Sequence, residues 1–280
     1  MIEVQSIQSC WVNGEVNGNF ITPFTDLNVE VPFKFTKEKR PVVVLGDREL
    51  PLVHRYKTDQ KVVGWLGGEP RVVVPEAYEF VKNNIDDFEM VFTFDEDLLN
   101  SHPKFRFCPF GSSRFSNKED RTIRSKDKNL SIIGNVRYCN YPGHILRDAI
   151  INKWGSEFDS IKNRGTFEDK KKYLNDFRYS VVVENSKQNH YFSEKLIDCL
   201  LVGTVPIYWG CDTLFDFGFD KRGIITFENE DDLEEILSSI GELDYEKRMP
   251  WVSHNHSIAQ SYLQCFYNKF LWENGLKELL

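Results

Sequence analysis

Short apolar runs alternate with amphipathic stretches along most of the chain, and the clearest case lies in residues 177–210. Residues 179–183 form a run, Tyr-Ser-Val-Val-Val, that is too short and too β-branched for a helix, so we expect a buried strand. Residues 193–202 place Leu and Ile on one helical face, and Gly203 is the usual residue just past a helix C-terminus. Residues 205–209 predict a second strand. Together these elements predict a βαβ unit with parallel strands and a right-handed crossover.

The N-terminal part of the chain repeats this alternation. Apolar runs at 41–46, 61–66 and 89–94 predict buried strands, and residues 75–85 predict a helix with Pro in its first turn. Residues 1–40 carry apolar runs broken by Asn, Gly and Thr, which favour strands only weakly. We therefore expect a first α/β domain over this part.

The C-terminal part has the same character. Residues 155–172 are charged and contain Gly, and we assign no element to them. Residues 244–280 are predicted to be mostly helical, as two helices. The other predicted elements are strands at 130–133 and 223–227 and helices at 144–154 and 231–240.

Residues 112–129 are polar, highly charged and almost free of aliphatic side chains. Such a composition is typical of a linker or a long exposed loop between domains. An alternative is that basic side chains of this segment line an interdomain cleft for an anionic substrate; these are Arg121, Arg124, Lys126 and Lys128.

Length and charge narrow the class of protein. A chain of 280 residues is long for one core and comfortable for two α/β domains. Its net charge of −8 argues against non-specific binding to nucleic acid or to anionic membranes. No apolar run approaches the roughly 20 residues of a membrane span, and the N-terminus lacks the pattern of a secretory signal. We expect no nucleic-acid partner and no integral membrane segment.

The cysteines indicate a reducing compartment. They are scattered without a Cys-x-x-Cys pair, which favours free thiols over disulfides or zinc ligands. We therefore expect a cytoplasmic protein. The six are Cys10, Cys108, Cys139, Cys199, Cys211 and Cys265.

The start of the helix near residue 193 has the chemistry of a phosphate site. Ligands of βαβ units sit at the carboxyl ends of the strands, where the loop meets the helix. Ser193 can cap the helix through its hydroxyl, and the unpaired N–H groups of the first turn favour an anion. Lys195 adds a full positive charge in the same turn.

This region resembles the donor-site motif of the α1,3/4-fucosyltransferases, glycosyltransferase family 10. The resembling residues are Glu184-Asn185-Ser186, then Tyr191, Ser193-Glu194-Lys195, and the run from Gly203 to Gly210. Val183 stands where the family usually has Phe, which keeps the position apolar. The resemblance is strong over about residues 177–228, moderate over 130–150 and weak over 60–111, and residues 1–60 carry none.

The resemblance implies a set of donor-binding residues. Arg147, in the predicted helix 144–154, falls where the family uses an arginine, and its planar guanidinium can hold two phosphate oxygens. A single Arg on a helix is otherwise solvated by default. Glu194 corresponds to a family residue that contacts the donor, and Asn185 and Tyr191 to residues that line the pocket. Tyr191 fits a packed aromatic side chain equally well.

The general base implied by the resemblance is a Glu in the amino-terminal domain, within an E-S-P-like turn after a strand. The corresponding stretch here is Gly-Trp-Leu-Gly-Gly-Glu-Pro, and Glu69 is the candidate. This sequence departs from the family because the residue between Glu and Pro is missing. The other candidates for the base are Asp95, Glu96, Asp97 and the more distant His54.

The resemblance implies an α/β, GT-B-like fold, with two facing Rossmann-like domains. We expect an acceptor-side domain at 1–115, a nucleotide-sugar domain at 130–243, and C-terminal helices at 244–280 that can pack back on the first domain. No acidic pair has the context of a metal ligand set, so we expect no metal and no cofactor beyond the donor substrate.

The function implied is that of an inverting glycosyltransferase that moves fucose from GDP-fucose to a hydroxyl of a glycan acceptor. One alternative is a transferase of a different nucleotide sugar, and another is a non-catalytic protein that binds nucleotides or glycans. A dehydrogenase is disfavoured because the chain lacks the G-x-G-x-x-G fingerprint.

Overall fold

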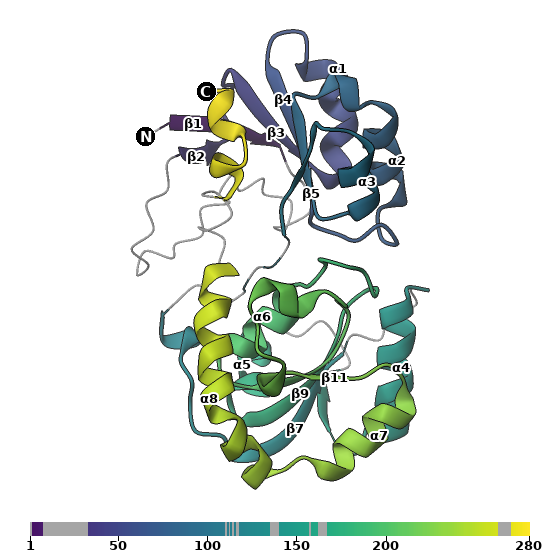
Figure 1. The fold of residues 1–280 in the computed structure, drawn as a ribbon, viewed down its shortest axis with the longest axis vertical. Coiled ribbons are helices and arrows are strands. Elements are labelled where there is room, and N and C mark those ends of the chain that lie inside the picture. Colours follow the sequence, from purple (N-terminus) through teal and green to yellow (C-terminus); the bar gives the residue numbers. More distant parts are fainter. Residues whose placement is uncertain are drawn as a thin grey trace. The chain divides into compact units, whose positions relative to one another are not determined.

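The computed structural model divides the chain into two units, which are coloured along the sequence in Figure 1. Unit 1 is Met1–Phe110 with Leu263–Leu280, and unit 2 is Gly111–Tyr262. The residues that the structure describes are 2–7, 33–109, 111, 113, 115, 118–134, 140–156, 158–161, 167–262 and 270–280.

Unit 1 contains a parallel sheet in which the described strands follow the order β2-β1-β3-β4-β5-β6. The chain runs from β1 outward to β2 and then returns to the other side of β1 to form β3, so the sheet has its topological switch point between β1 and β3. The strands are β1 (Ile2–Ile7), β2 (Phe33–Thr36), β3 (Val42–Gly46), β4 (Lys61–Leu66), β5 (Met90–Thr93) and β6 (Phe105–Phe107).

Helices cover one face of this sheet, and the end of the chain lies against the other (Figure 1). The first face packs Val43, Val62 and Val91 against buried side chains of the helices, such as Tyr78. On the second face, the ring of Trp272 stacks on Phe33 at 6.1 Å between centroids. The helical elements are η1 (Asp47–Leu52), α1 (Val53–Tyr56), α2 (Pro75–Asn83), η2 (Ile85–Asp87), α3 (Glu96–Ser101) and η7 (Leu276–Glu278).

Unit 2 contains a second parallel sheet, in the order β11-β10-β9-β7-β8 among the described strands. Here the chain runs from β7 outward to β8 and returns to the other side of β7 as β9, so the switch point lies between β7 and β9. The strands are β7 (Lys128–Ile133), β8 (Asp159–Ile161), β9 (Phe177–Val183), β10 (Val205–Trp209) and β11 (Ile225–Thr226).

The helices of unit 2 flank its sheet. Figure 1 shows α4 and α7 side by side, and Lys153 of α4 lies 3.0 Å from Glu234 of α7. Helix α8 packs on the end of α6, where the Tyr245 hydroxyl donates to the carbonyl of Gly203 at 2.7 Å. The helices are α4 (Pro142–Trp154), η3 (Lys118–Arg121), α5 (Phe167–Asn175), α6 (Glu194–Leu201), η4 (Leu214–Phe217), η5 (Lys221–Gly223), α7 (Glu230–Ser239), α8 (Glu242–Ala259) and η6 (Gln260–Tyr262).

The predicted βαβ unit is confirmed. Strands β9 and β10 are parallel and α6 connects them. Gly203 lies just past the end of α6 with φ +74°, and a Cβ there would approach Ile123 to 2.7 Å, so Gly is required for both reasons.

Residues 155–172, to which no element was assigned from the sequence, contain β8 and the first turns of α5. The strand expected at 223–227 is only two residues long, because η5 occupies its first position. Of the residues predicted as C-terminal helices, 244–262 belong to unit 2 and 263–280 to unit 1. Within the part of the chain that is described, no helix combines the length and apolarity that a bilayer crossing needs.

The buried cysteines lead to a first prediction. Cys108, Cys199 and Cys211 are free and buried, whereas Cys10, Cys139 and Cys265 lie outside the described residues. Burial raises the pKa of the Cys108 and Cys199 thiols to about 12. Because the thiolate is the reactive form, we expect both to be alkylated at least roughly tenfold more slowly in the native than in the unfolded protein at pH 8.

The measurement is mass spectrometry of protein labelled with a maleimide, with and without denaturant and without reductant. All six cysteines should be labelled in the unfolded protein. A cysteine that is labelled only after reduction would reveal a disulfide and contradict the expectation of a reducing compartment.

Candidate functional site

The candidate site of unit 2 lies at the switch point between β7 and β9. Two segments meet there: the N-terminal end of α4 and the loop that follows β9. The backbone N–H of Gly143 in α4 donates to the carbonyl of Asn185 in that loop at 3.1 Å. Gly is required at position 143, since a Cβ would lie 1.6 Å from the carbonyl oxygen of Glu184. Open α/β sheets bind their ligands at such switch points.

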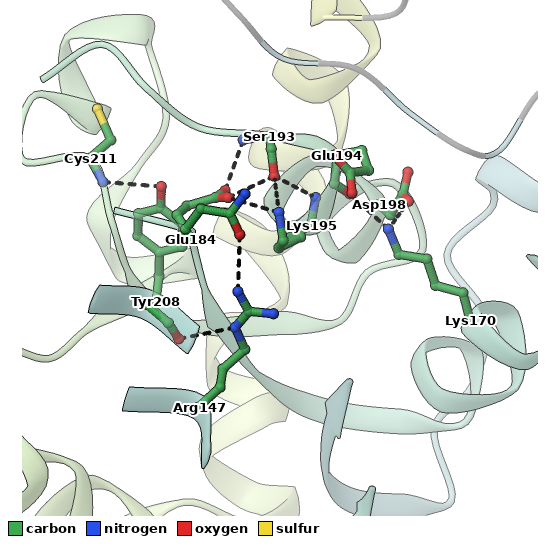
Figure 2. A network of polar contacts seen from close by, with 11 residues as sticks. Arg147, Lys170, Glu184, Ser193, Glu194, Lys195, Asp198, Tyr208 and Cys211 are labelled. Atoms are coloured by element: carbon green, nitrogen blue, oxygen red, sulfur yellow. Dashed lines mark hydrogen bonds and ion pairs between the residues drawn. The ribbon is translucent and has the colours of Figure 1, made fainter. Parts of the chain in front are cut away.

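A fully buried carboxylate, Glu184, organises the loop after β9 (Figure 2). One of its oxygens accepts from the backbone N–H of Ser193 at 2.8 Å. The other accepts from the Ser193 hydroxyl at 2.7 Å and lies 3.3 Å from the ammonium group of Lys195. The first and last residues of this loop are therefore joined by charge-assisted hydrogen bonds, which are the strong ones in proteins.

Helix α6 begins beside this carboxylate. The Ser193 hydroxyl accepts from the backbone N–H of Lys195 at 3.3 Å, which confirms Ser193 as the helix cap. The ammonium of Lys195 also lies 3.0 Å from that hydroxyl, and 27% of the lysine side chain is exposed. A cation and the positive end of a helix dipole therefore lie together at the carboxyl end of the strands.

Arg147 approaches the same loop from α4 (Figure 2). Its Nη2 donates to the side-chain oxygen of Asn185 at 3.0 Å, and its Nε donates to the carbonyl of Gly143 at 3.1 Å. The residue is only 6% exposed, so the alternative of a solvated helix residue does not fit. Burial lowers the pKa of the Arg147 guanidinium, and the charge of Glu184 opposes that shift.

The other two donor-binding candidates differ in exposure. Tyr191 is 1% exposed, which agrees with its alternative role as a packed aromatic side chain. Glu194 is half-buried as the first residue of α6, and its backbone carbonyl accepts from the ammonium of Lys170 at 3.2 Å. Asn185, Ser193, Lys195 and Arg147 are thus brought together, with Glu194 next to them in sequence.

A buried ion pair supports α6 from outside the motif. The ammonium of Lys170 in α5 lies 2.5 Å from the carboxylate of Asp198 in α6, which is wholly buried. The Ser113 hydroxyl donates to the same carboxylate at 2.7 Å. This support was missed because Lys170 falls in the charged segment 155–172, and no local signal distinguishes it from a solvated lysine.

Two basic residues of the polar segment 112–129 point into unit 2. Arg121 is 4% exposed and donates to the carbonyl of Phe115 at 3.0 Å. Lys126 is 8% exposed and donates to the carbonyls of Asn175 and Val202, each at 2.8 Å. The alternative that these two side chains line a cleft for an anion is therefore wrong. Their cationic groups donate hydrogen bonds to backbone carbonyls at the ends of neighbouring elements.

Glu69 lies in unit 1, in the loop that follows β4, and is half-buried. The Tyr78 hydroxyl donates to its backbone carbonyl at 2.9 Å. Among the alternatives, Asp95 is 3% exposed and already accepts from Arg71 at 2.7 Å and from the backbone N–H of Leu98 at 3.1 Å. Asp95 therefore acts as the cap of α3 and as an ion-pair partner.

The remaining candidates for the base are more exposed. Glu96 and Asp97 lie in the first turn of α3, and the Asp97 side chain is 93% exposed. His54 is 53% exposed and lies 3.3 Å from Asp87. A half-buried acid at the carboxyl end of a strand is better suited to accept a proton than these solvated groups, so Glu69 stays the candidate.

Two acids were not assigned a role from the sequence: Glu184, which was quoted only as part of the motif, and Asp47, which follows β3. A signal for both was present, since each comes directly after a buried strand whose carboxyl end faces a switch point. Among the described residues, no group of three or more His, Cys, Asp or Glu side chains is gathered as metal ligands would be.

The architecture of two parallel α/β sheets matches the GT-B fold, which several solved glycosyltransferases share. A crystal structure of an α1,3-fucosyltransferase covers 92% of this chain and 80% of its own, with a TM-score of 0.52 and 15% identity. Anabaena HepE in complex with UDP has a TM-score of 0.55, 10% identity and coverage of 83% and 77%. A trehalose-6-phosphate synthase has a TM-score of 0.57, 8% identity and coverage of 85% and 74%.

Within that class, the sequence is similar to fucosyltransferases. A protein of Acanthamoeba polyphaga mimivirus named as a fucosyltransferase is 26% identical over 176 residues, which cover 56% of this chain and 29% of the relative. The α-(1,3)-fucosyltransferase FucT of Helicobacter pylori is 26% identical over 112 residues, covering 40% and 20%. The resemblance drawn from the donor-site motif is thus confirmed, although the chain spans less than a third of either relative. No family model matches the chain.

The network around Glu184 leads to a second prediction. Glu184→Ala leaves the Lys195 ammonium and the Ser193 N–H without their buried acceptor, and losing one partner of a buried pair typically lowers the free energy of unfolding by about 3–5 kcal/mol. Glu228 is a suitable control, since it also pairs with a lysine but its side chain is 62% exposed. Glu228→Ala should cost less than about 1 kcal/mol.

Urea denaturation followed by circular dichroism measures both variants against the wild type. Equal, small losses of stability in the two variants would show that the Glu184 network does not hold the loop.

Proposed function

We propose that this protein is an inverting glycosyltransferase that transfers fucose from GDP-fucose to a hydroxyl group of a glycan acceptor. The observation that carries the proposal is the convergence of Arg147, Lys195 and the N-terminus of α6 on the loop after β9. The 26% identity to two proteins named as fucosyltransferases supports fucose as the sugar.

The donor part of the proposal concerns the leaving group. When the bond to the sugar breaks, negative charge grows on the nucleoside diphosphate, and prearranged positive groups stabilise it. Lys195 and Arg147 supply two cations from two different helices, and the N–H groups at the start of α6 supply partial positive charge. On this proposal the two cations take the place of a metal ion at the diphosphate. Asn185 orients the guanidinium of Arg147, and Glu194 binds hydroxyl groups of the donor.

The acceptor part of the proposal concerns Glu69. Inversion requires a base that takes the proton of the acceptor hydroxyl as its oxygen attacks the anomeric carbon. Glu69 is the carboxylate in unit 1 that matches the family position, and it lies at the carboxyl end of β4, next to the switch-point strand β3. The acceptor is accordingly proposed to bind unit 1 and the donor unit 2.

A different nucleotide sugar is the main alternative, because none of the donor-site residues recognises fucose by itself. The structure of HepE, which has the same fold, is a complex with UDP, so the fold also serves uridine nucleotides. A binding protein without catalysis is the second alternative, since the turn at Glu69 lacks one residue of the family pattern.

The third prediction tests the diphosphate site. Loss of a hydrogen bond to a charged group typically costs about 1.5–3 kcal/mol, so Lys195→Ala and Arg147→Ala should each weaken GDP binding by roughly ten- to a hundredfold. Lys187 is a matched control, because it lies in the same loop but pairs outward with Glu228 and Asp212. Lys187→Ala should bind GDP as the wild type does.

Isothermal titration of GDP, UDP and GDP-fucose into each variant measures these affinities, with a melting curve of each variant to check that it is folded. Wild-type affinity for GDP in both folded variants would remove the proposed phosphate site. Tighter binding of UDP than of GDP would favour the alternative donor.

The fourth prediction tests the base. Since a base acts in the transition state, Glu69→Gln should retain GDP binding and lower the rate of transfer by on the order of 10²- to 10⁴-fold. Glu76→Gln, an exposed carboxylate on α2, should keep the wild-type rate. The measurement is product formation from GDP-fucose across a panel of glycan acceptors. Full activity of Glu69→Gln would place the base elsewhere, whereas GDP binding without any transfer by the wild type would favour the binding protein.

A further inference from the structure

Asp47 lies at the switch point of the sheet in unit 1. It directly follows β3, which neighbours β1 on one side and β4 on the other. The loop that carries Glu69 follows β4, and the carboxyl ends of parallel strands meet at one edge of the sheet. Asp47 and the loop of Glu69 therefore share the edge of the sheet at which α/β proteins bind ligands.

The backbone of Asp47 is strained and its side chain is buried. Its φ angle is +30°, which is unusual for a residue with a Cβ, and the residue is only 1% exposed. Strained backbone of this kind is concentrated at functional sites. Burial of a carboxyl group is unfavourable and does not improve core packing, so we expect Asp47 to have another role.

The hydrogen bonds of Asp47 point to that reason. Its Oδ1 accepts from the backbone N–H groups of Gly67 and Gly68, each at 3.2 Å. Its Oδ2 is buried and has no hydrogen-bond partner among the described residues. The residue after Gly68 is Glu69, and its backbone carbonyl accepts a hydrogen bond from the Tyr78 hydroxyl. Buried side chains therefore bind the backbone both just before Glu69, at the N–H groups of Gly67 and Gly68, and at the carbonyl of Glu69 itself.

The charge of Asp47 acts on the same loop. Burial raises the pKa of the Asp47 carboxyl to about 7, and the charges of Glu69 and Glu49 contribute to the rise, while the N–H groups of Gly67 and Gly68 oppose it. The charged and titratable groups that interact with Asp47 are Glu49 of η1, Glu69 of the β4 loop and Tyr78 of α2. Coupled carboxyls titrate in two steps that belong to the pair.

We propose that Asp47 is a positioning residue for Glu69: its buried carboxyl holds the Gly67–Gly68 backbone in place, and its negative charge increases the tendency of the Glu69 carboxylate to accept a proton. This inference rests on the proposed role of Glu69 as the base. Like charges held close together disfavour double ionisation, so ionised Asp47 makes Glu69 the stronger base.

Two substitutions separate the two effects. Asp47→Asn keeps an acceptor oxygen for the glycine N–H groups and removes the charge. Asp47→Gly removes the side chain altogether but suits the positive φ, so that it relieves the backbone strain. Glu49→Gln is the control, since it removes a second buried acid from the same η1 segment.

Positioning is measured by amide hydrogen exchange at Gly67 and Gly68. We expect exchange at least tenfold faster in Asp47→Gly than in the wild type, and wild-type protection in Asp47→Asn and Glu49→Gln. Unchanged protection in Asp47→Gly would overturn the positioning role, whether or not transfer has been detected.

The electrostatic role is measured by titrating the ¹³C-labelled Glu69 carboxyl, assigned through Glu69→Gln. Because Asp47 ionises near pH 7, the Glu69 signal of the wild type should show a second step there. Asp47→Asn should lose that step, while Glu49→Gln should keep a step that is moved to lower pH, since the charge of Glu49 contributes to the raised pKa of Asp47. Persistence of the step in Asp47→Asn would overturn this role.

Stability gives an independent check of the sign. The native state binds the Asp47 proton more tightly than the unfolded state, so the contribution of Asp47 to the free energy of unfolding should fall as the pH rises from about 4 to about 7. Asp47→Asn should lose this contribution, so that its free energy of unfolding rises relative to the wild type over the same pH range. A wild-type slope in the variant would contradict the buried titration.

Activity then separates failure of this inference from failure of the proposed function. GDP affinity should be unchanged in both Asp47 variants, while kcat should drop about ten- to a hundredfold in Asp47→Gly. In Asp47→Asn the rise of kcat/KM near pH 7 should disappear. If both variants transfer at the wild-type rate across the pH range, the inference about Asp47 is overturned and the proposed function is not. If the wild type binds GDP but transfers nothing, the proposed function is overturned. The exchange and titration results would then still decide the role of Asp47.

Discussion

The carboxylate of Glu184 is the group on which the candidate donor site depends. It is wholly buried and binds the backbone and hydroxyl of Ser193 and the ammonium of Lys195. A buried charge is tolerated only when it is paired and hydrogen-bonded, so the loop after β9 can close in few other ways. The start of α6 and the Lys195 side chain are oriented as a consequence, and Arg147 reaches the same loop through Asn185.

Both units place an acid at the switch point of their sheet, but the two acids have different surroundings. In each, an acid directly follows a buried parallel strand at the switch point: Glu184 after β9 and Asp47 after β3. Glu184 is compensated by a lysine and organises cations, which suits an anionic ligand. Asp47 accepts from the backbone N–H groups of Gly67 and Gly68 and interacts with the charges of Glu49 and Glu69, as its proposed role beside the base requires.

Much of this architecture could be predicted from the chain. The βαβ unit at 177–210 and the Ser193 cap follow from local patterns that report on burial and helix ends, whereas the GT-B class was implied by the resemblance of the donor-site motif to a known family. The elements of segment 155–172 could not be predicted in the same way, because its charged residues suggest exposure to solvent. Lys170 is in fact paired with the buried Asp198, and only the folded chain shows this pair. Lys126 was misjudged for the same reason, since its partners are backbone carbonyls at 174, 175 and 202, which composition does not reveal.

The sequence by itself determined which chemistry is present: a Ser-Glu-Lys helix start after a buried strand, an Arg on an earlier helix, and a Glu in a Gly-Gly-Glu-Pro turn. Tertiary structure decided which of these groups meet. Hydrophobic periodicity specifies elements and their buried faces, but strand order specifies which carboxyl ends become neighbours. Only that order brings Arg147 to Asn185 and Asp47 to the glycines before Glu69, because these partners lie far apart along the chain and interact through short-range hydrogen bonds.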